Sequence, residues 1–299
     1  MEKTLNNIRT LALLSLLFSS PFAVARCDEA KTVKHEFDRD SFTAMHLYAL
    51  AGELNVRGND SDKIVFHAVA CSDEQQYLDR ISLDISEDSS ELILTVIIPY
   101  ADHDFDANYA HMDIDLTLPS DFPLSIKDSS GNITVNDAQV LLIDDSSGEI
   151  NVRDSRGDLV LKDSSGGIDV NDHTGNIFVT DSSGNIDLSR ISGSVTIPGD
   201  SSGEIEIDTV SDFVRIDNDS SGSIQIEEVG ADVTIGNDGS GDINISEVKG
   251  SIIVENDGSG RLKVTQVDGD FTLKSKGSGN VKTRDIAGQV SLPRNKSAQ

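Results

Sequence analysis

The chain has 299 residues, of which 52 are acidic and 24 basic, and its formal net charge is −28. Such a surface repels nucleic acid and anionic lipid, so the sequence excludes a nucleic-acid-binding protein. Aromatic residues make up only 5% of the chain, tryptophan is absent and 24 residues are glycine, which favours thin stacked layers over one large irregular core.

Residues 1–25 have the pattern of a signal peptide. Lys3 and Arg9 give a positive start, residues 11–18 form an apolar run, and Ala23-Val24-Ala25 forms a small-residue cleavage site. The apolar run is well short of the ~20 residues that a membrane span requires. We therefore expect an exported protein, periplasmic, secreted or at the cell surface, whose mature chain has no transmembrane segment.

The mature chain would contain two cysteines, Cys27 and Cys71. Export implies an oxidising compartment, so a disulfide between these residues is expected to tie the new N-terminus to the first domain. Two unpaired thiols remain the alternative.

Residues 26–127 form a predicted N-terminal β-rich cap that also contains degenerate coils of the later repeat. Gly52 and the apolar residues around it, followed by the apolar stretch 64–69, resemble one such coil. The other expected elements are a short helix or turn at 75–80, a hairpin or two adjacent coils at 81–85 and 92–98, a polar Asp- and His-rich loop at 100–111, and a strand at 112–118.

From Asp128 onward the chain repeats the motif Asp-Ser-Ser-Gly-x-Ile. The spacing of the leading residue is 17, then 18 twice and then 19 five times, ending in a Lys276 version. With the first residue of each unit as position 0, apolar side chains fall at +5, +7, +10, +14 and +16, as in Ile224, Ile226, Val229, Val233 and Ile235. The pairs +5/+7 and +14/+16 have the period of a strand, and Gly at +3 suits a tight turn.

This pattern predicts an all-β fold, a single-stranded parallel β-solenoid (β-helix) with coils of about 19 residues. We assign residues 128–292 to the solenoid and 293–299 to a polar tail. The last unit has Thr283 in place of an apolar residue at +7, and we expect it to close the far end of the stack.

Stacking would bring the first residue of every unit into one row. Carboxylates ~5 Å apart repel each other by roughly 1 kcal/mol even in wet surroundings, and a calcium ion would relieve this repulsion. The staggered Gly/Asp motif of calcium-binding solenoids is absent, so a turn device in which each Asp accepts hydrogen bonds from the following amides is the competing interpretation. The candidate metal ligands are Asp128, Asp145, Asp163, Asp181, Asp200, Asp219, Asp238 and Asp257.

The residues Leu116-Thr117-Leu118-Pro119, Pro123-Leu124-Ser125-Ile126 and the recurrent Ser-Gly-x-Ile-x-Val units resemble the bacterial "putative adhesin" family of β-strand-repeat proteins, the DUF4097 type. The resemblance implies an exported, non-enzymatic solenoid of otherwise unknown function with a surface or adhesive role. It supplies no catalytic residues. Our leading hypothesis is a scaffold that presents its repetitive face to a glycan, an envelope component or another protein. The alternatives are a calcium-responsive envelope module and a polysaccharide-active β-helix enzyme.

Overall fold

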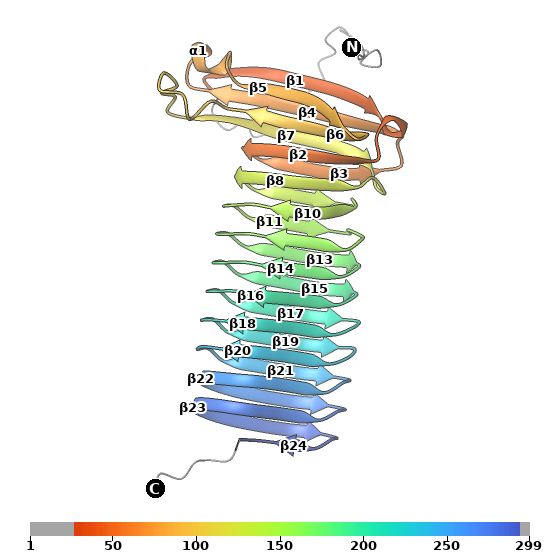
Figure 1. Ribbon diagram of the computed structural model, residues 1–299, viewed down its shortest axis with the longest axis vertical. Coiled ribbons are helices and arrows are strands. Elements are labelled where there is room, and N and C mark those ends of the chain that lie inside the picture. Colours follow the sequence, from red (N-terminus) through yellow and green to blue (C-terminus); the bar gives the residue numbers. More distant parts are fainter. Residues whose placement is uncertain (1–26, 294–299) are drawn as a thin grey trace.

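The computed structural model describes residues 27–293, so the predicted signal peptide and residues 294–299 of the predicted tail lie outside the described residues. The protein is a parallel β-solenoid of about nine turns, as the repeat predicted. Figure 1 shows a straight rod with a broader N-terminal cap at one end and strand β24 at the other.

Each coil contributes one strand to each of two parallel sheets. The first sheet contains the +5/+7 strands: β9 (Ile133–Asn136), β11 (Ile150–Arg153), β13 (Ile168–Thr174), β15 (Ile186–Ser192), β17 (Ile205–Val210), β19 (Ile224–Val229) and β21 (Ile243–Val248).

The second sheet contains the +14/+16 strands. They are β8 (Leu124–Ser130), β10 (Val140–Asp144), β12 (Leu159–Lys162), β14 (Ile177–Thr180), β16 (Val195–Gly199), β18 (Val214–Asp219), β20 (Val233–Asp238) and β24 (Val290–Ser291). Strands β22 (Ile252–Val267) and β23 (Phe271–Ile286) bend around a corner of the coil and belong to both sheets.

The core lies between the two sheets and consists of stacked identical positions. Ile224 pairs in register with Ile205 on one side and with Ile243 on the other, and all three are at most 1% exposed. A single coil has only its own two strands to cover these side chains, so the stacking of neighbours completes the core. The predicted apolar positions are therefore confirmed as the interior.

The glycine at +3 is required by the close approach of successive coils. Gly222 has a φ of 145°, and a Cβ atom there would lie 1.6 Å from the carbonyl oxygen of Gly203. Only glycine adopts this conformation at low cost and leaves room for the neighbouring backbone. The same contact recurs along the edge of the rod as far as Gly279.

A second bend, at position +9, was not anticipated from the sequence. The residue at this position has a φ between 51° and 58° in nine successive coils although none is glycine, as in Arg190 and Glu247. This left-handed residue turns the side chain that follows it inward, so that Ile191 and Val248, at position +10, are 1% exposed.

The cap extends both sheets beyond the first coil. Strands β2 (Ala44–Ala51) and β3 (Leu54–Asn59) form that coil, because β2 pairs in parallel with β8 and β3 with β9. The first sheet continues through β7 (Ala110–Pro119), β4 (Lys63–Ser72) and β1 (Glu29–Asp38), and the second through β6 (Glu91–Ile97) and β5 (Ser82–Asp88).

One sequence expectation for the cap differs from the structure. Residues 64–69 do not form part of a degenerate coil; they lie in β4, which runs antiparallel to β1 and β7. The apolar run in β4 looks the same whether its neighbours are parallel or antiparallel, so the sequence did not distinguish the two. The expected short helix is α1 (Gln75–Leu78), a 3-10 turn spans Arg39–Ser41, and β5 and β6 form the hairpin.

The last coil does not close the stack within residues 27–293. Its inward positions Val281 and Ile286 are only partly buried, and Thr283 is exposed. The expectation of a closing unit was wrong for the described chain, because a departure from the repeat does not supply a covering layer.

Among residues 27–293, no helix is long and apolar enough to cross a membrane.

We predict that Gly222→Ala destabilises the protein by about 2–4 kcal/mol, because it adds a backbone clash to a left-handed conformation. Urea denaturation followed by circular dichroism measures the change. Gly199→Ala is the matched control, since no atom lies within 4 Å of a Cβ built there. Equal effects of the two substitutions would contradict the role assigned to the +3 glycine.

Candidate functional site

The eight predicted ladder aspartates point into the corner of the coil. Each is between 1% and 5% exposed, and each follows the two inward apolar side chains of a +14/+16 segment. In Asp145, Asp163, Asp181 and Asp200, one carboxylate oxygen accepts hydrogen bonds from amides of the following serines. Oδ1 of Asp163, for example, accepts from Ser164 at 2.7 Å and from Ser165 at 3.3 Å. The same contact to the first serine recurs at Asp145 and Asp181, which supports the turn-device interpretation.

Other oxygens of this row are buried without an N–H or hydroxyl donor. One such oxygen is present in Asp145, Asp163, Asp181 and Asp200, and both oxygens are in this state in Asp128, Asp219 and Asp238. Burying a charge without a partner is costly, so the charged form is disfavoured. Burial raises the pKa of Asp128 and Asp238 to about 7 and that of Asp181 and Asp219 to about 6.

Neighbouring coils add to this effect. Besides burial, repulsion from Asp219 and Asp257 raises the pKa of Asp238. For Asp219, repulsion from Asp200 adds to the effect of burial in raising the pKa. Asp128, Asp181, Asp219 and Asp238, with pKa values of about 6 to 7, are therefore the members of the row that bind a proton most readily near neutral pH.

These aspartates have the oxygen chemistry of a calcium site, but they lie inside a closed corner. Ca²⁺ takes six to eight oxygen ligands and usually some water, whereas each of these side chains is nearly inaccessible to solvent. The calcium role of the row therefore stays a prediction.

The opposite edge of the coil carries a long trough of about 1150 Å³. Its two rims are the largely exposed side chains at +9 and +11, and the buried side chains at +10 lie between them. An ion pair, Arg190 Nε to Asp172 Oδ1 at 2.7 Å, crosses between adjacent coils at one end. Glu228 and Glu247 occupy the same +9 row in consecutive coils, with Lys249 on the facing rim.

A buried polar pair interrupts the apolar +10 row. Ser155 Oγ lies 2.7 Å from His173 Nδ1, and the two residues are 3% and 1% exposed. Burial lowers the pKa of His173, so the ring is neutral, and its Nε2 is buried without a hydrogen-bond partner. Because so little of either side chain is exposed, we assign the pair to the core and not to a substrate-binding site.

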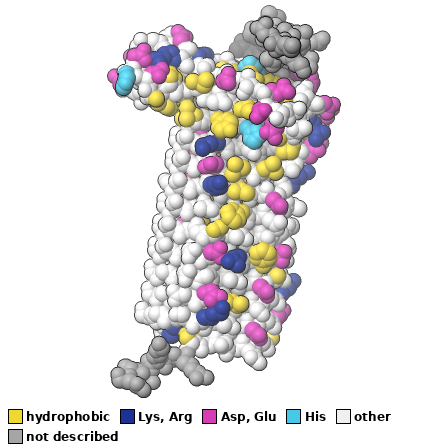
Figure 2. Space-filling model, viewed as in Figure 1, with side chains coloured by type: hydrophobic (Ala, Val, Ile, Leu, Met, Phe, Trp, Pro, Cys, Tyr) yellow, Lys and Arg dark blue, Asp and Glu magenta, His cyan; other side chains and the backbone are white. Residues whose placement is uncertain are grey.

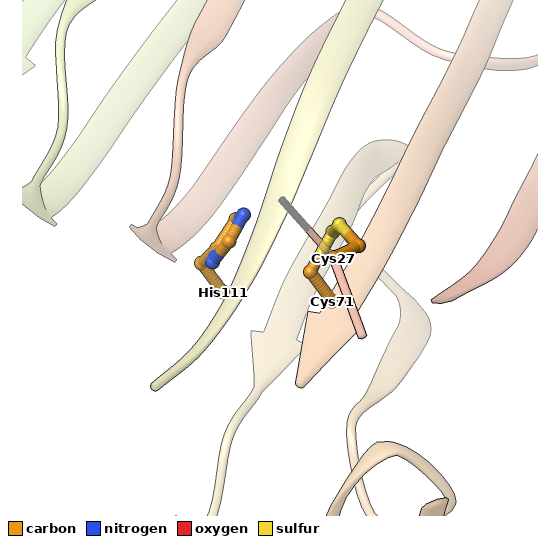
Figure 3. Close-up of side chains that lie close together, drawn as sticks. All are labelled: Cys27, Cys71 and His111. Atoms are coloured by element: carbon orange, nitrogen blue, oxygen red, sulfur yellow. A yellow bond between two sulfur atoms is a disulfide. The ribbon is translucent and has the colours of Figure 1, made fainter. Parts of the chain in front are cut away.

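The cap contains a disulfide between Cys27 and Cys71, with Cα atoms 5.4 Å apart. It holds the start of the described chain against β4, and His111 of β7 lies beside it (Figure 3). The nearby Asp- and His-rich loop is used for ion pairing: Arg80 contacts Asp102 at 2.5 Å and Asp104 at 3.0 Å.

The outer face of the second sheet carries an apolar strip, defined here as Leu141, Leu142, Val160 and Phe178. Leu142 pairs in register with Val160 and Val160 with Phe178, so the side chains stack in three consecutive coils. Leu141 is 38% and Phe178 41% exposed. Figure 2 shows hydrophobic side chains in a column along one face of the rod, beside a column of alternating charges.

Sequence reasoning missed this strip because its residues lie at outward positions, where the repeat imposes no residue type. The neighbouring column contains Lys127, Asp144 and Lys162, and Lys127 Nζ lies 3.9 Å from Asp144 Oδ2. An apolar column beside a polar one suits a ligand that has both apolar and polar groups.

Fold and surface together define a capped, regular β-solenoid with an exposed apolar strip. No family model and no curated protein matches the chain. A "putative adhesin" from Bacteroides fragilis is 14% identical, with 88% of this chain and 97% of that one covered, at a TM-score of 0.36. A "putative cell adhesion protein" from Clostridium sporogenes is 12% identical, with 89% and 99% covered, at 0.30.

A "putative lipid binding protein" from Parabacteroides distasonis is 13% identical, with 88% of this chain and 97% of that chain covered, at a TM-score of 0.31. At these identities and scores the likenesses carry no argument about function.

We predict that the protein is more stable at pH 5 than at pH 8, by at least about 5 °C in Tm. A carboxyl whose pKa is higher in the folded chain binds more protons when folded. The stabilising contribution of the ladder is therefore complete below the usual aspartate pKa of 3.8 and is lost as the pH rises through 6 to 7. Tm measured across this pH range by circular dichroism checks the direction.

The variant Asp219→Asn/Asp238→Asn should reduce this pH dependence and raise Tm at pH 8, because it removes two carboxyls of the row. Asp212→Asn/Asp268→Asn, at exposed positions, is the control that removes the same negative charge without touching the ladder. An unchanged pH profile in the ladder variant would show that the row is not the cause.

Proposed function

We propose that the protein is an exported, non-enzymatic scaffold of the adhesin type that binds a glycan on the outer face of its second sheet. The observation that carries the proposal is the apolar strip. On a chain with a net charge of −28, a column of outward apolar side chains, of which Leu141 and Phe178 are exposed and Leu142 and Val160 half-buried, is a surface suited to contact with a ligand.

The chemistry of the face favours a carbohydrate. A sugar ring has an apolar face, which stacks on aromatic and aliphatic side chains, and hydroxyl groups at its edge, which hydrogen-bond to polar ones. The aromatic ring of Phe178 could stack on the sugar, and Thr196 occupies the same column in the next coil. Lys162, two positions after Val160, and Thr180, which pairs with Lys162 in register, supply donors and acceptors in the neighbouring column.

The regular spacing of the coils suits a linear polymer. Each coil repeats the face at ~4.8 Å along the rod, so a chain lying parallel to the axis meets similar contacts several times. Several weak contacts in a row give useful avidity without a deep pocket.

Two alternatives have their own residues. A polysaccharide-active enzyme would use the trough, where Glu228 and Glu247 lie in consecutive coils beside Lys249. A calcium-responsive module would use the aspartate row. Release of reducing ends from polysaccharides tests the first, and a shift in Tm between added calcium and a chelator tests the second.

We predict that Phe178→Ala/Val160→Ser weakens glycan binding at least about tenfold, because it removes two of the four apolar side chains of the strip. A glycan array identifies the best ligand, and isothermal titration calorimetry then measures Kd. Both residues point outward, so Tm should stay within about 2 °C of the wild type.

Glu228→Gln/Glu247→Gln, in the trough, is the matched control and should leave Kd unchanged. Loss of binding in this control with normal binding by the strip variant would move the site to the trough. Absence of binding to every glycan tested, with capture of a protein through Phe178, would overturn the carbohydrate assignment.

A further inference from the structure

The two ends of the rod differ in how their strands terminate. At the C-terminal end, β23 pairs with β22 over its whole length, but on its other side only Phe271 and Thr272 pair with β24. Within residues 27–293, the backbone from 273 to 286 therefore presents one row of N–H and C=O groups without a neighbouring strand. Such an edge is a template for a further strand.

The core is also incomplete at this end. Leu262 and Val267 are 1% exposed, whereas Val281 and Ile286, one coil further along, are only partly buried. Val290 is 45% exposed, among the most exposed large apolar side chains described. One more layer placed on this end would bury these residues as the preceding coils bury theirs.

The charge of the chain changes sign at the open end. Residues 261–293 contain six basic and three acidic residues, whereas residues 27–127 contain seven basic and 21 acidic ones. Lys282 and Arg284 are exposed on the last coil. The remainder of the described chain is strongly acidic, so the C-terminal end is electrostatically distinct from it.

The opposite end offers a complementary edge. Two strands at this end have a free outer edge in the described chain: β5, which pairs only with β6 and ends the second sheet, and β1, which pairs only with β4 and ends the first. Asp84, Glu87 and Asp88 of β5 are exposed, and Leu83 and Ile85 are only partly buried. The β5 edge thus combines unpaired backbone groups, partly buried apolar side chains and negative charge. The C-terminal end also has unpaired backbone groups and partly buried apolar side chains, but its charge is positive.

We propose that the protein self-associates head to tail, with the open basic coil of one copy stacked on the acidic β5 edge of the next. The two surfaces differ, so the interface is heterologous and does not close on itself. Addition of copies along the rod axis continues the stacking and produces a chain of rods. A symmetric contact between two basic ends would place like charges together and is disfavoured.

Sedimentation velocity of the purified protein across a range of concentrations tests this proposal. We expect species larger than the monomer to grow with concentration at low salt and to dissociate in about 0.5 M NaCl, because the contact between the ends is charged. A protein that remains monomeric up to the highest concentration at low salt would falsify it.

Charge reversal locates the interface. Lys282→Glu/Arg284→Glu at one end and Glu87→Lys/Asp88→Lys at the other should each weaken self-association at least about tenfold. An equimolar mixture of the two variants should restore association, because each altered end then meets an oppositely charged partner. Failure of the mixture to associate would refute the head-to-tail geometry.

Arg153→Glu/Arg215→Glu, on exposed positions between the two ends of the rod, is the matched control and should associate as the wild type does. If it weakens association equally, net charge rather than the ends governs the effect and the proposal is wrong. Binding of the basic end to phosphatidylglycerol vesicles, without any self-association, would instead assign that end to an anionic membrane and also overturn the proposal.

Discussion

The close approach of backbone to backbone between successive coils is the constraint on which the structure depends. Where Gly203 and Gly222 meet, the carbonyl oxygen of one coil occupies the space that a side chain of the next would need. The coils can stack in register only if that position stays bare. When that position is glycine, residues at the same repeat position lie against each other in neighbouring coils. Each row of the rod therefore brings like side chains together.

Like-on-like stacking has opposite consequences for different residue types. Isoleucine on isoleucine buries apolar surface, and Asn237 donates to Asn218 at 2.9 Å to form an amide ladder. Aspartate on aspartate is unfavourable when both are charged. The chain tolerates a buried row of eight because serine amides satisfy one oxygen in several coils and raised pKa values leave part of the row neutral.

The sequence predicted the two-strand coil and its buried positions because periodicity records which way a side chain faces within a strand. It could not predict which way the aspartates face, since the period breaks at the turn that contains them. The left-handed bend at Arg190 and Glu247 has no residue-type signature, and the order of β4 and β7 in the cap depends on tertiary contacts. The apolar strip at Phe178 occupies positions that the repeat leaves free.

The excursion of the chain between β3 and β8 bears on how the molecule folds. Ile205 finds its partner Ile224 in the very next coil, as most paired positions in the rod do, whereas Leu54 must find Ile133 across the whole of the β4–β7 excursion. Closing the longer loop costs about 1 kcal/mol more in chain entropy, and contacts of long sequence separation form slowly. Chain entropy therefore favours pairing among the coils after β9 and sets a higher cost on pairing the N-terminal coil with them.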